Sequence, residues 1–225
     1  MPRHTLQPRC AGCGLIPARC LCAKLPRTEL PWPLAIVQHG KEAGKPTNTA
    51  RLVARVVANA RLLPFARRGA PWSAAALGGG DVERFVLFPA ADARPLDRDW
   101  CAARRGRPTE LVLLDGTWRQ AGRMVRRADG IATLPRVALP PGPPSRWRIR
   151  SAPRGDQLCT FETVVRLAAI GADAAAAALL ERAFQQLLGA QGRNPACDHE
   201  AREGGEALDA SEALDSDGEF DERDE

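Results

Sequence analysis

Short runs of apolar residues alternate along the chain with segments that carry apolar residues at helical spacing. Residues 34–38, 85–88 and 110–114 are almost wholly apolar, and a polar turn or a proline follows each run. Runs of this length without polar alternation are typical of strands that are buried on both faces. We therefore predict strands at these ranges and a further short strand at 137–139.

The segments between these strands carry the helical pattern. We predict helices at 49–63, 119–127, 160–168 and 173–188. Thr47 or Asn48 can cap the first helix and Thr160 the third, and Pro64 ends the first. Apolar strands that alternate with helices indicate a parallel α/β sheet. Ligands of such sheets bind beyond the carboxyl ends of the strands, where Asp115 stands.

Composition divides the chain into three parts. Residues 1–33 are dense in Cys, Pro and Arg and show no periodicity, so this segment needs a metal to fold. Residues 34–193 form the α/β domain. Residues 194–225 are acidic with few bulky apolar residues, and we expect a disordered tail there.

The modest net charge of +5 hides an asymmetry between the tail and the rest of the chain. From Asp198 to Glu225 the net charge is −11, which leaves +16 on residues 1–197. A basic body suits a polyanionic partner such as nucleic acid. An alternative is that the arginines only reflect the chain's general bias toward Ala, Arg, Gly and Pro.

Four of the seven cysteines lie within thirteen residues, at Cys10, Cys13, Cys20 and Cys22. The chain has no run of 18–20 apolar residues and no apolar core in residues 1–9, so we expect a cytoplasmic protein without a membrane partner. An odd cysteine count in that setting argues against a disulfide framework. Four close thiolates suit tetrahedral zinc in a structural site, although free thiols or an iron–sulfur cluster are alternatives.

Polar residues gather after the predicted strands. Asp115 ends one strand, Gly116 lets the chain turn, and Thr117 can cap the next helix, although this could be a purely structural turn. The loop 39–49 resembles a phosphate loop but has Pro46 where a P-loop needs Ser or Thr. The arginines of residues 140–154 could contact phosphate or could simply be exposed.

Taken together, these segments resemble the DTW-domain family of tRNA-uridine aminocarboxypropyltransferases over about residues 10–190. The family opens with a cysteine cluster, continues with a His-x-x-Glu loop and Asn-Thr, then Asp-x-Thr-Trp, then Thr-x-Glu. The matching residues here are Cys10 to Cys22, His39, Glu42, Asn48, Thr49, Asp115, Thr117, Trp118, Thr160 and Glu162. Gly40 stands where the family's loop often has proline, and the acidic tail lies outside the pattern.

The resemblance implies a SPOUT-like, knotted parallel sheet that binds S-adenosylmethionine (SAM) and tRNA, with no DNA partner. It implies transfer of the 3-amino-3-carboxypropyl group of SAM to N3 of a uridine. Asp115 is then either the base that removes the N3 proton or a ligand of SAM. The expected cofactor-binding residues are Pro89, Leu114, Asp115, Thr117, Trp118 and Thr160, and the expected RNA contacts are His39, Lys41, Asn48, Arg146 and Arg148.

Three other functions fit parts of the same pattern. A SAM-dependent RNA methyltransferase would use the same fold and site. A zinc-bearing RNA-binding protein without catalysis would need no carboxylate at the sheet edge. An enzyme acting on a small acidic substrate would also explain the arginines, but it would show no salt-dependent binding of tRNA.

Overall fold

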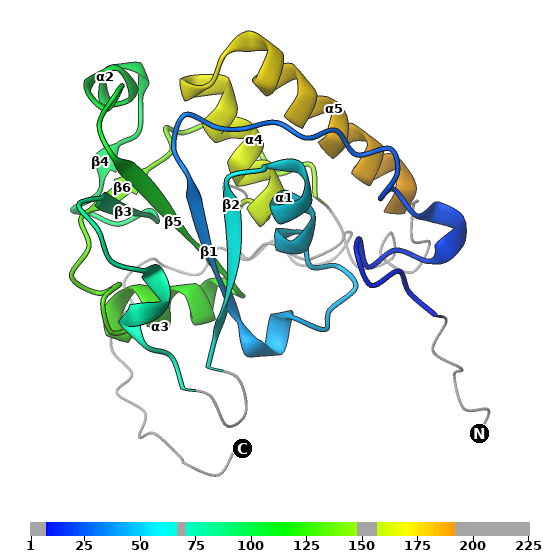
Figure 1. Ribbon diagram of the computed structural model, residues 1–225, viewed down its shortest axis with the longest axis horizontal. Helices are drawn as coiled ribbons and strands as arrows, with labels where there is room; N and C mark the ends of the chain where they lie inside the picture. The colour runs from blue at the N-terminus through cyan, green and yellow to red at the C-terminus, as the bar shows by residue number, and fades with distance from the viewer. Residues whose placement is uncertain (1–7, 67–70, 148–156, 192–225) are drawn as a thin grey trace, which may run out of the picture. The chain divides into compact units, whose positions relative to one another are not determined.

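The structure, a computed structural model, describes residues 8–66, 71–147 and 157–191. The expected acidic tail and the predicted RNA contact Arg148 lie outside these residues. Within them, a parallel sheet and its flanking helices confirm the predicted α/β class (Figure 1).

The sheet has six strands in the order β2-β1-β5-β3-β6-β4. Their bounds are β1 Leu34–His39, β2 Ala60–Phe65, β3 Glu83–Leu87, β4 Arg94–Pro95, β5 Thr109–Asp115 and β6 Arg136–Ala138. Every neighbouring pair is parallel, so the carboxyl ends of all strands meet at one edge. The strands predicted at 34–38, 85–88, 110–114 and 137–139 correspond to β1, β3, β5 and β6.

Helices cover both faces of the sheet. Their bounds are α1 Ala50–Val56, α2 Arg98–Ala103, α3 Trp118–Arg127, α4 Thr160–Gly171 and α5 Ala174–Gln191. Leu34 and Ile36 of β1 pack into one apolar cluster with α1, α4 and α5, whereas Ala35 and Val37 pack into a second cluster with α3. Burial on both faces explains why the central strands carry no polar alternation.

The N-terminal segment shares the core of the sheet. Leu15, Leu21, Leu30 and Trp32 are at most 8% exposed and belong to the same cluster as α1, α4 and α5. Figure 1 shows this segment running beside α5, where the Arg19 guanidinium donates a hydrogen bond to the carbonyl of Ala190. The cysteine loop is therefore packed against the α/β domain.

The helix predicted at 49–63 was too long. α1 ends at Val56, and residues 60–65 form the strand β2. The side chain of Asn59 accepts a hydrogen bond from Leu30 N at 3.1 Å and donates one to Leu30 O at 2.8 Å, which fixes the turn between α1 and β2. Pro64 fits because β2 is an edge strand, where a missing N–H is tolerated.

Two predicted helix caps also differ. Thr160 is the first residue of α4, and its cap is Cys159, whose Sγ accepts from Glu162 N. This arrangement frees the Thr160 hydroxyl for another partner. The N-cap of α1 is Thr49, while the Asn48 side chain accepts a hydrogen bond from Ala50 N at 3.1 Å.

Candidate active site

A cavity of about 840 Å³ opens at the carboxyl edge of the sheet. Its size falls within the range of small-molecule sites. Its walls come from the ends of β3, β5 and β6, the starts of α3 and α4, the residues just before α1, and the loop before residue 148. All six residues predicted to bind the cofactor line the cavity: Pro89, Leu114, Asp115, Thr117, Trp118 and Thr160. Asn48 lines it as well.

Asp115 lies at the centre of a polar cluster in the cavity wall. Its carboxylate is 4% exposed and accepts three hydrogen bonds. Oδ2 accepts from Asn48 Nδ2 at 2.6 Å and from Gln38 Nε2 at 3.0 Å, and Oδ1 accepts from the Thr160 hydroxyl at 2.6 Å. Gln38 Nε2 also lies 3.0 Å from Asn48 Oδ1, so the four side chains form one network.

The donors to Asp115 are all neutral. No lysine, arginine or histidine in the described parts of the chain pairs with this carboxylate. A carboxylate has about four lone-pair sites, and three are occupied here. A buried anion without a countercharge is costly unless a positive ligand arrives. The geometry therefore suits a cationic group in the cavity.

The turn after β5 positions the aromatic wall of the cavity. Thr117 caps α3 as predicted, because its hydroxyl accepts from Gln120 N at 3.2 Å while Gln120 Oε1 accepts from Thr117 N at 2.8 Å. This reciprocal capping fixes the start of the helix. Trp118, the first residue of α3, lies with its ring centroid 5.8 Å from that of Phe88. Two aromatic rings therefore stand side by side in the cavity wall.

His39 and Lys41 lie beside the cavity and are not among the residues that line it. His39 Nδ1 accepts a hydrogen bond from Lys41 N at 3.2 Å, and burial lowers the pKa of His39. Lys41 is exposed. Position 40 between them cannot take the proline that the family's loop often has, because a Cβ there would lie 2.8 Å from the carbonyl oxygen of Ala66.

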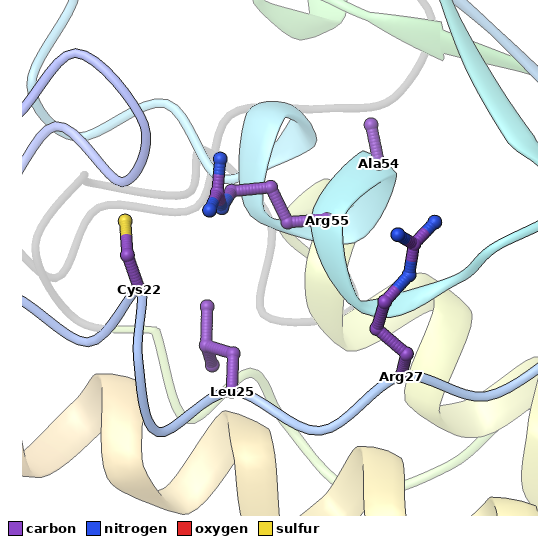
Figure 2. Close-up of a pocket in the computed structure, with 5 residues that line it drawn as sticks. All are labelled: Cys22, Leu25, Arg27, Ala54 and Arg55. Carbon is purple, nitrogen blue, oxygen red and sulfur yellow. The ribbon is translucent and has the colours of Figure 1, made fainter.

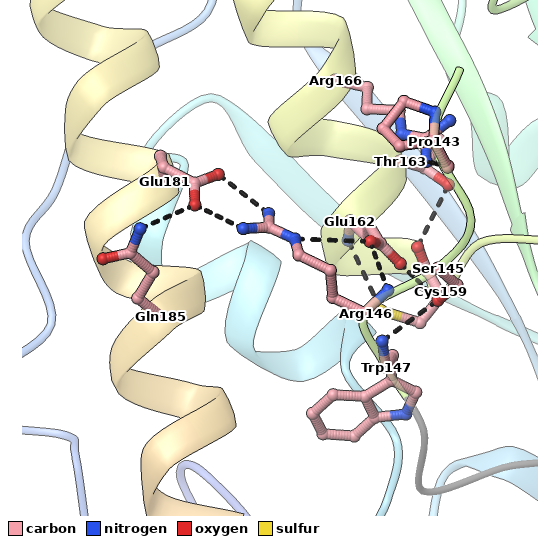
Figure 3. A network of polar contacts seen from close by, with 10 residues as sticks. All are labelled: Pro143, Ser145, Arg146, Trp147, Cys159, Glu162, Thr163, Arg166, Glu181 and Gln185. Carbon is pink, nitrogen blue, oxygen red and sulfur yellow. Dashed lines mark hydrogen bonds and ion pairs between the residues drawn. The ribbon is translucent and has the colours of Figure 1, made fainter. Parts of the chain in front are cut away.

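Arg146 takes part in an internal ion-pair network (Figure 3). Its guanidinium lies 2.6 Å from Glu181 Oε1, 3.7 Å from Glu162 Oε1 and over the ring of Phe184. Glu162, which is 2% exposed, also accepts from Arg146 N and from the Ser145 hydroxyl. The network fastens the cavity loop, including Trp147, to α4 and α5.

Sequence reasoning missed two contributors to the site: Gln38 and Ser145. Gln38 could have been found, because it is a polar residue at the carboxyl end of an otherwise apolar strand. Ser145 belongs to a loop without periodicity, and only the fold shows that this loop, with Trp147 as a candidate stacking residue, closes one side of the cavity.

The four clustered cysteines meet in space. Their sulfur atoms all lie within 4.8 Å of one another, with Cys10–Cys22 at 3.6 Å, Cys13–Cys20 at 3.7 Å and Cys10–Cys20 at 3.5 Å. Sulfurs placed about 2.3 Å from zinc in a tetrahedron are separated by about 3.8 Å. Hydrogen bonds from the backbone of Cys13 and Gly12 lower the pKa of Cys10 to about 6, whereas burial raises the pKa of Cys22 to about 12. The donor set fits a structural zinc ion.

A smaller cavity of about 270 Å³ lies between this cysteine loop and α1. Figure 2 shows the side chains of Arg27 and Arg55 on either side of it, with Cys22 and Leu25 at its wall. It is lined by residues different from those of the cavity at the sheet edge.

Among the described helices, none combines the length and the apolar character that crossing a membrane requires.

Comparison with known proteins identifies a family. The sequence model described as the DTW domain matches residues 7–192. A solved structure, described as the SAM-dependent rRNA:acp-transferase Tsr3 from Vulcanisaeta distributa, is 19% identical and superimposes with a TM-score of 0.40. That match covers 69% of this chain and 71% of the other.

Proposed function

Because this chain belongs to the DTW-domain family, we propose that it is a SAM-dependent RNA-modifying enzyme that transfers the 3-amino-3-carboxypropyl group of SAM to N3 of a tRNA uridine. The observation that carries this proposal is the Asp115 cluster. A buried carboxylate that has no cationic partner among the described residues lines a cavity large enough for a small molecule. SAM brings positive charge at its sulfonium and amino groups.

SAM supplies an activated carbon next to its sulfonium. The new bond joins N3 of uridine to the terminal carbon of the aminocarboxypropyl group, the bond from that carbon to sulfur breaks, and methylthioadenosine leaves. The N3 proton passes to solvent water. Methyl transfer would use another carbon on the same sulfur, so the outcome depends on how the cavity orients the cofactor.

Asp115 is better suited to hold a cation of SAM than to remove the N3 proton. Three of its lone pairs already accept hydrogen bonds from Gln38, Asn48 and Thr160, which leaves little capacity for a proton. A positive group in the cavity would instead supply the missing countercharge. Phe88 and Trp118 offer rings on which adenine or uracil can stack.

The Cys10, Cys13, Cys20 and Cys22 cluster holds structural zinc in this proposal. Zinc would replace the thiol protons and cross-link the four cysteines of the loop. Leu15 and Leu21 from the same segment pack in the main core. Metal analysis of the purified protein would give one zinc per chain. Chelation would then lower the melting temperature of the whole domain.

The remaining assignments complete the proposal. The chain adopts the knotted SPOUT-like connectivity, with a zinc segment at 1–33, a catalytic domain at 34–193 and an acidic tail at 194–225. The protein is cytoplasmic, and its RNA partner is tRNA. His39, Lys41 and Asn48 then lie near the bound RNA, as do Arg146 and Arg148.

The test is a mass measurement on nucleosides from unmodified tRNA incubated with the protein and SAM. We expect a uridine that gains the aminocarboxypropyl mass, and loss of this product in Asp115→Asn. The exposed Asp81→Asn serves as the control and should retain the product. A methyl gain would instead assign a methyltransferase. No product together with no SAM binding would leave a zinc-bearing RNA-binding protein.

A further inference from the structure

Helix α3 carries a stripe of four exposed arginines that starts at the rim of the large cavity. Arg119, Arg123, Arg126 and Arg127 are all exposed, and Arg119 lines the cavity. At 100° per residue they fall within an arc of about 100° on the helix. The opposite side of α3 buries Ala121, Met124 and Val125 against the sheet. We call these four residues the α3 stripe.

Within the described ranges, none of the four guanidinium groups of the α3 stripe pairs with a carboxylate, and α3 itself contains no acidic residue. Several other arginines are paired: Arg61 and Arg84 with Glu110, Arg104 with Glu83, and Arg146 with Glu181. The stripe differs from other exposed arginines, such as Arg98 and Arg105, because its four charges lie on one helix face and begin at the cavity.

The arrangement is unfavourable for an isolated helix. Arg119 lies in the first turn, where the helix dipole disfavours a cation. Arg119 and Arg123, and again Arg123 and Arg127, are like charges four residues apart, a spacing that destabilises a helix. Arg126 and Arg127 lie in the last turn, where the dipole favours cations, so the dipole opposes only Arg119 at the cavity end. An anionic partner would offset that cost and the repulsion between arginines four residues apart.

We propose that the α3 stripe is the surface on which the RNA backbone docks, so that phosphates next to the target nucleotide lie along α3 while the base enters the cavity. Arg119, Arg123 and Arg127 are spaced by about 6 Å along the helix axis, which offers about one charge per turn to an extended polyanion. Phosphate contacts of this kind position the nucleic acid without reading its sequence. The identity of the polyanion as RNA rests on the proposed function.

The stripe differs electrostatically from Arg146, the described arginine among the predicted RNA contacts. Arg146 is held by Glu181 and Glu162, so its charge is largely compensated within the protein. Arg123 and Arg127 have no such neighbours among the residues that the structure describes, and their charge is free to meet phosphate.

The experiment compares two double variants of the full chain. Arg123→Gln/Arg127→Gln removes two charges from the stripe, and glutamine keeps a high helix propensity. Arg98→Gln/Arg105→Gln removes two exposed arginines in and just after α2, which lies at the other end of the strands in Figure 1. Binding of unmodified tRNA is measured over a series of salt concentrations, and SAM binding is measured by calorimetry.

For the stripe variant we expect tRNA affinity to fall roughly tenfold or more at 0.1 M salt, and the slope of log K against log salt to decrease by about 1.5–2. SAM affinity should stay unchanged, and the α2 variant should bind tRNA like the unaltered protein. Arg123→Lys/Arg127→Lys should restore most of the affinity, because lysine keeps the charge.

Unchanged tRNA affinity and salt slope in the stripe variant would overturn the proposal, as would an equal loss in the α2 variant. Retained tRNA binding with lost binding of polyglutamate would also overturn it, because it would assign the stripe to an acidic protein segment. Failure of the proposed function looks different: tRNA binding would depend on the stripe, but no SAM-dependent product would form.

Discussion

Strand β5 carries a buried carboxylate near each end, and the two are held in opposite ways. Glu110 at the amino end is 5% exposed and pairs with the guanidinium groups of Arg61 and Arg84, each at 2.8 Å. Asp115 at the carboxyl end is 4% exposed, and its donors in the described part of the chain are all neutral. The first charge is balanced within the protein, whereas the second faces a cavity. Equal burial therefore does not imply an equal role.

The largest effect should come from breaking the balanced pair. Glu110→Gln leaves two guanidinium groups without their carboxylate, and we expect the free energy of unfolding to fall by about 2–4 kcal/mol. Urea denaturation measures this change, and SAM affinity of the folded protein should not move. Glu83→Gln is the control, because its carboxylate is 46% exposed at the same end of the sheet, so its loss should cost less than about 1 kcal/mol. Similar costs for both variants would contradict a special role for Glu110.

At the carboxyl end of β5 we expect a small loss of stability and a large loss of SAM affinity. Asp115→Asn keeps the shape of the side chain and can still accept from Gln38 and Asn48 while its amide donates to the Thr160 hydroxyl. The free energy of unfolding should change by less than about 1 kcal/mol. SAM affinity, measured by calorimetry, should fall roughly ten- to 150-fold, since a bond to a charged group is lost. Full SAM affinity in this variant would remove Asp115 from the binding site.

Removal of one neutral donor to Asp115 should have a smaller effect. Thr160→Val removes the hydroxyl that donates to Asp115 Oδ1 and leaves that buried oxygen without this partner. We expect a loss of about 1 kcal/mol in the free energy of unfolding. Thr160→Ser keeps the hydroxyl and should behave like the unaltered protein. If both variants were equally destabilised, the methyl group rather than the hydrogen bond would be the important feature.

The partly exposed carboxylate of Glu181 should give the smallest loss of stability. The hydrogen bond from Arg146 lowers the pKa of Glu181. The pair therefore stabilises the protein at neutral pH, and this contribution disappears as the pH falls through that lowered pKa. Glu181→Gln should cost less than about 0.5 kcal/mol at pH 7, because both side chains are about a third exposed or more. Unfolding curves should converge at acid pH, and a difference independent of pH would contradict the ion pair.

The two ends of β5 also show what sequence can predict. The central strands were predictable because burial on both faces removes polar residues from 34–38 and 110–114. The DTW turn was predictable because a carboxylate, a glycine and a capping threonine follow in order. Strand β2 was not, since residues 60–63 share the apolar spacing of the preceding helix. Long-range contacts end that helix: Thr28 pairs with Val57, and Asn59 bonds to Leu30.

The partners of Asp115 were only partly predictable. Asn48 and Thr160 were singled out as ligand contacts, but nothing in the sequence shows that both donate to one carboxylate. The charge of Arg146 suggested RNA, and its compensation by Glu181 depends on the packing of α5 against the loop. Long-range pairings of this kind follow from tertiary structure rather than from local spacing.

The composition of the Asp115 network has a consequence for the order of folding. Gln38, Asn48 and Thr160 are separated from Asp115 by 77, 67 and 45 positions along the chain. Contacts this distant form late, because long loops must close first. During synthesis, the network cannot be complete until α4 has left the ribosome. A nascent chain would therefore acquire its ligand site in a single late step, and ligand binding would distinguish finished molecules from partly folded ones.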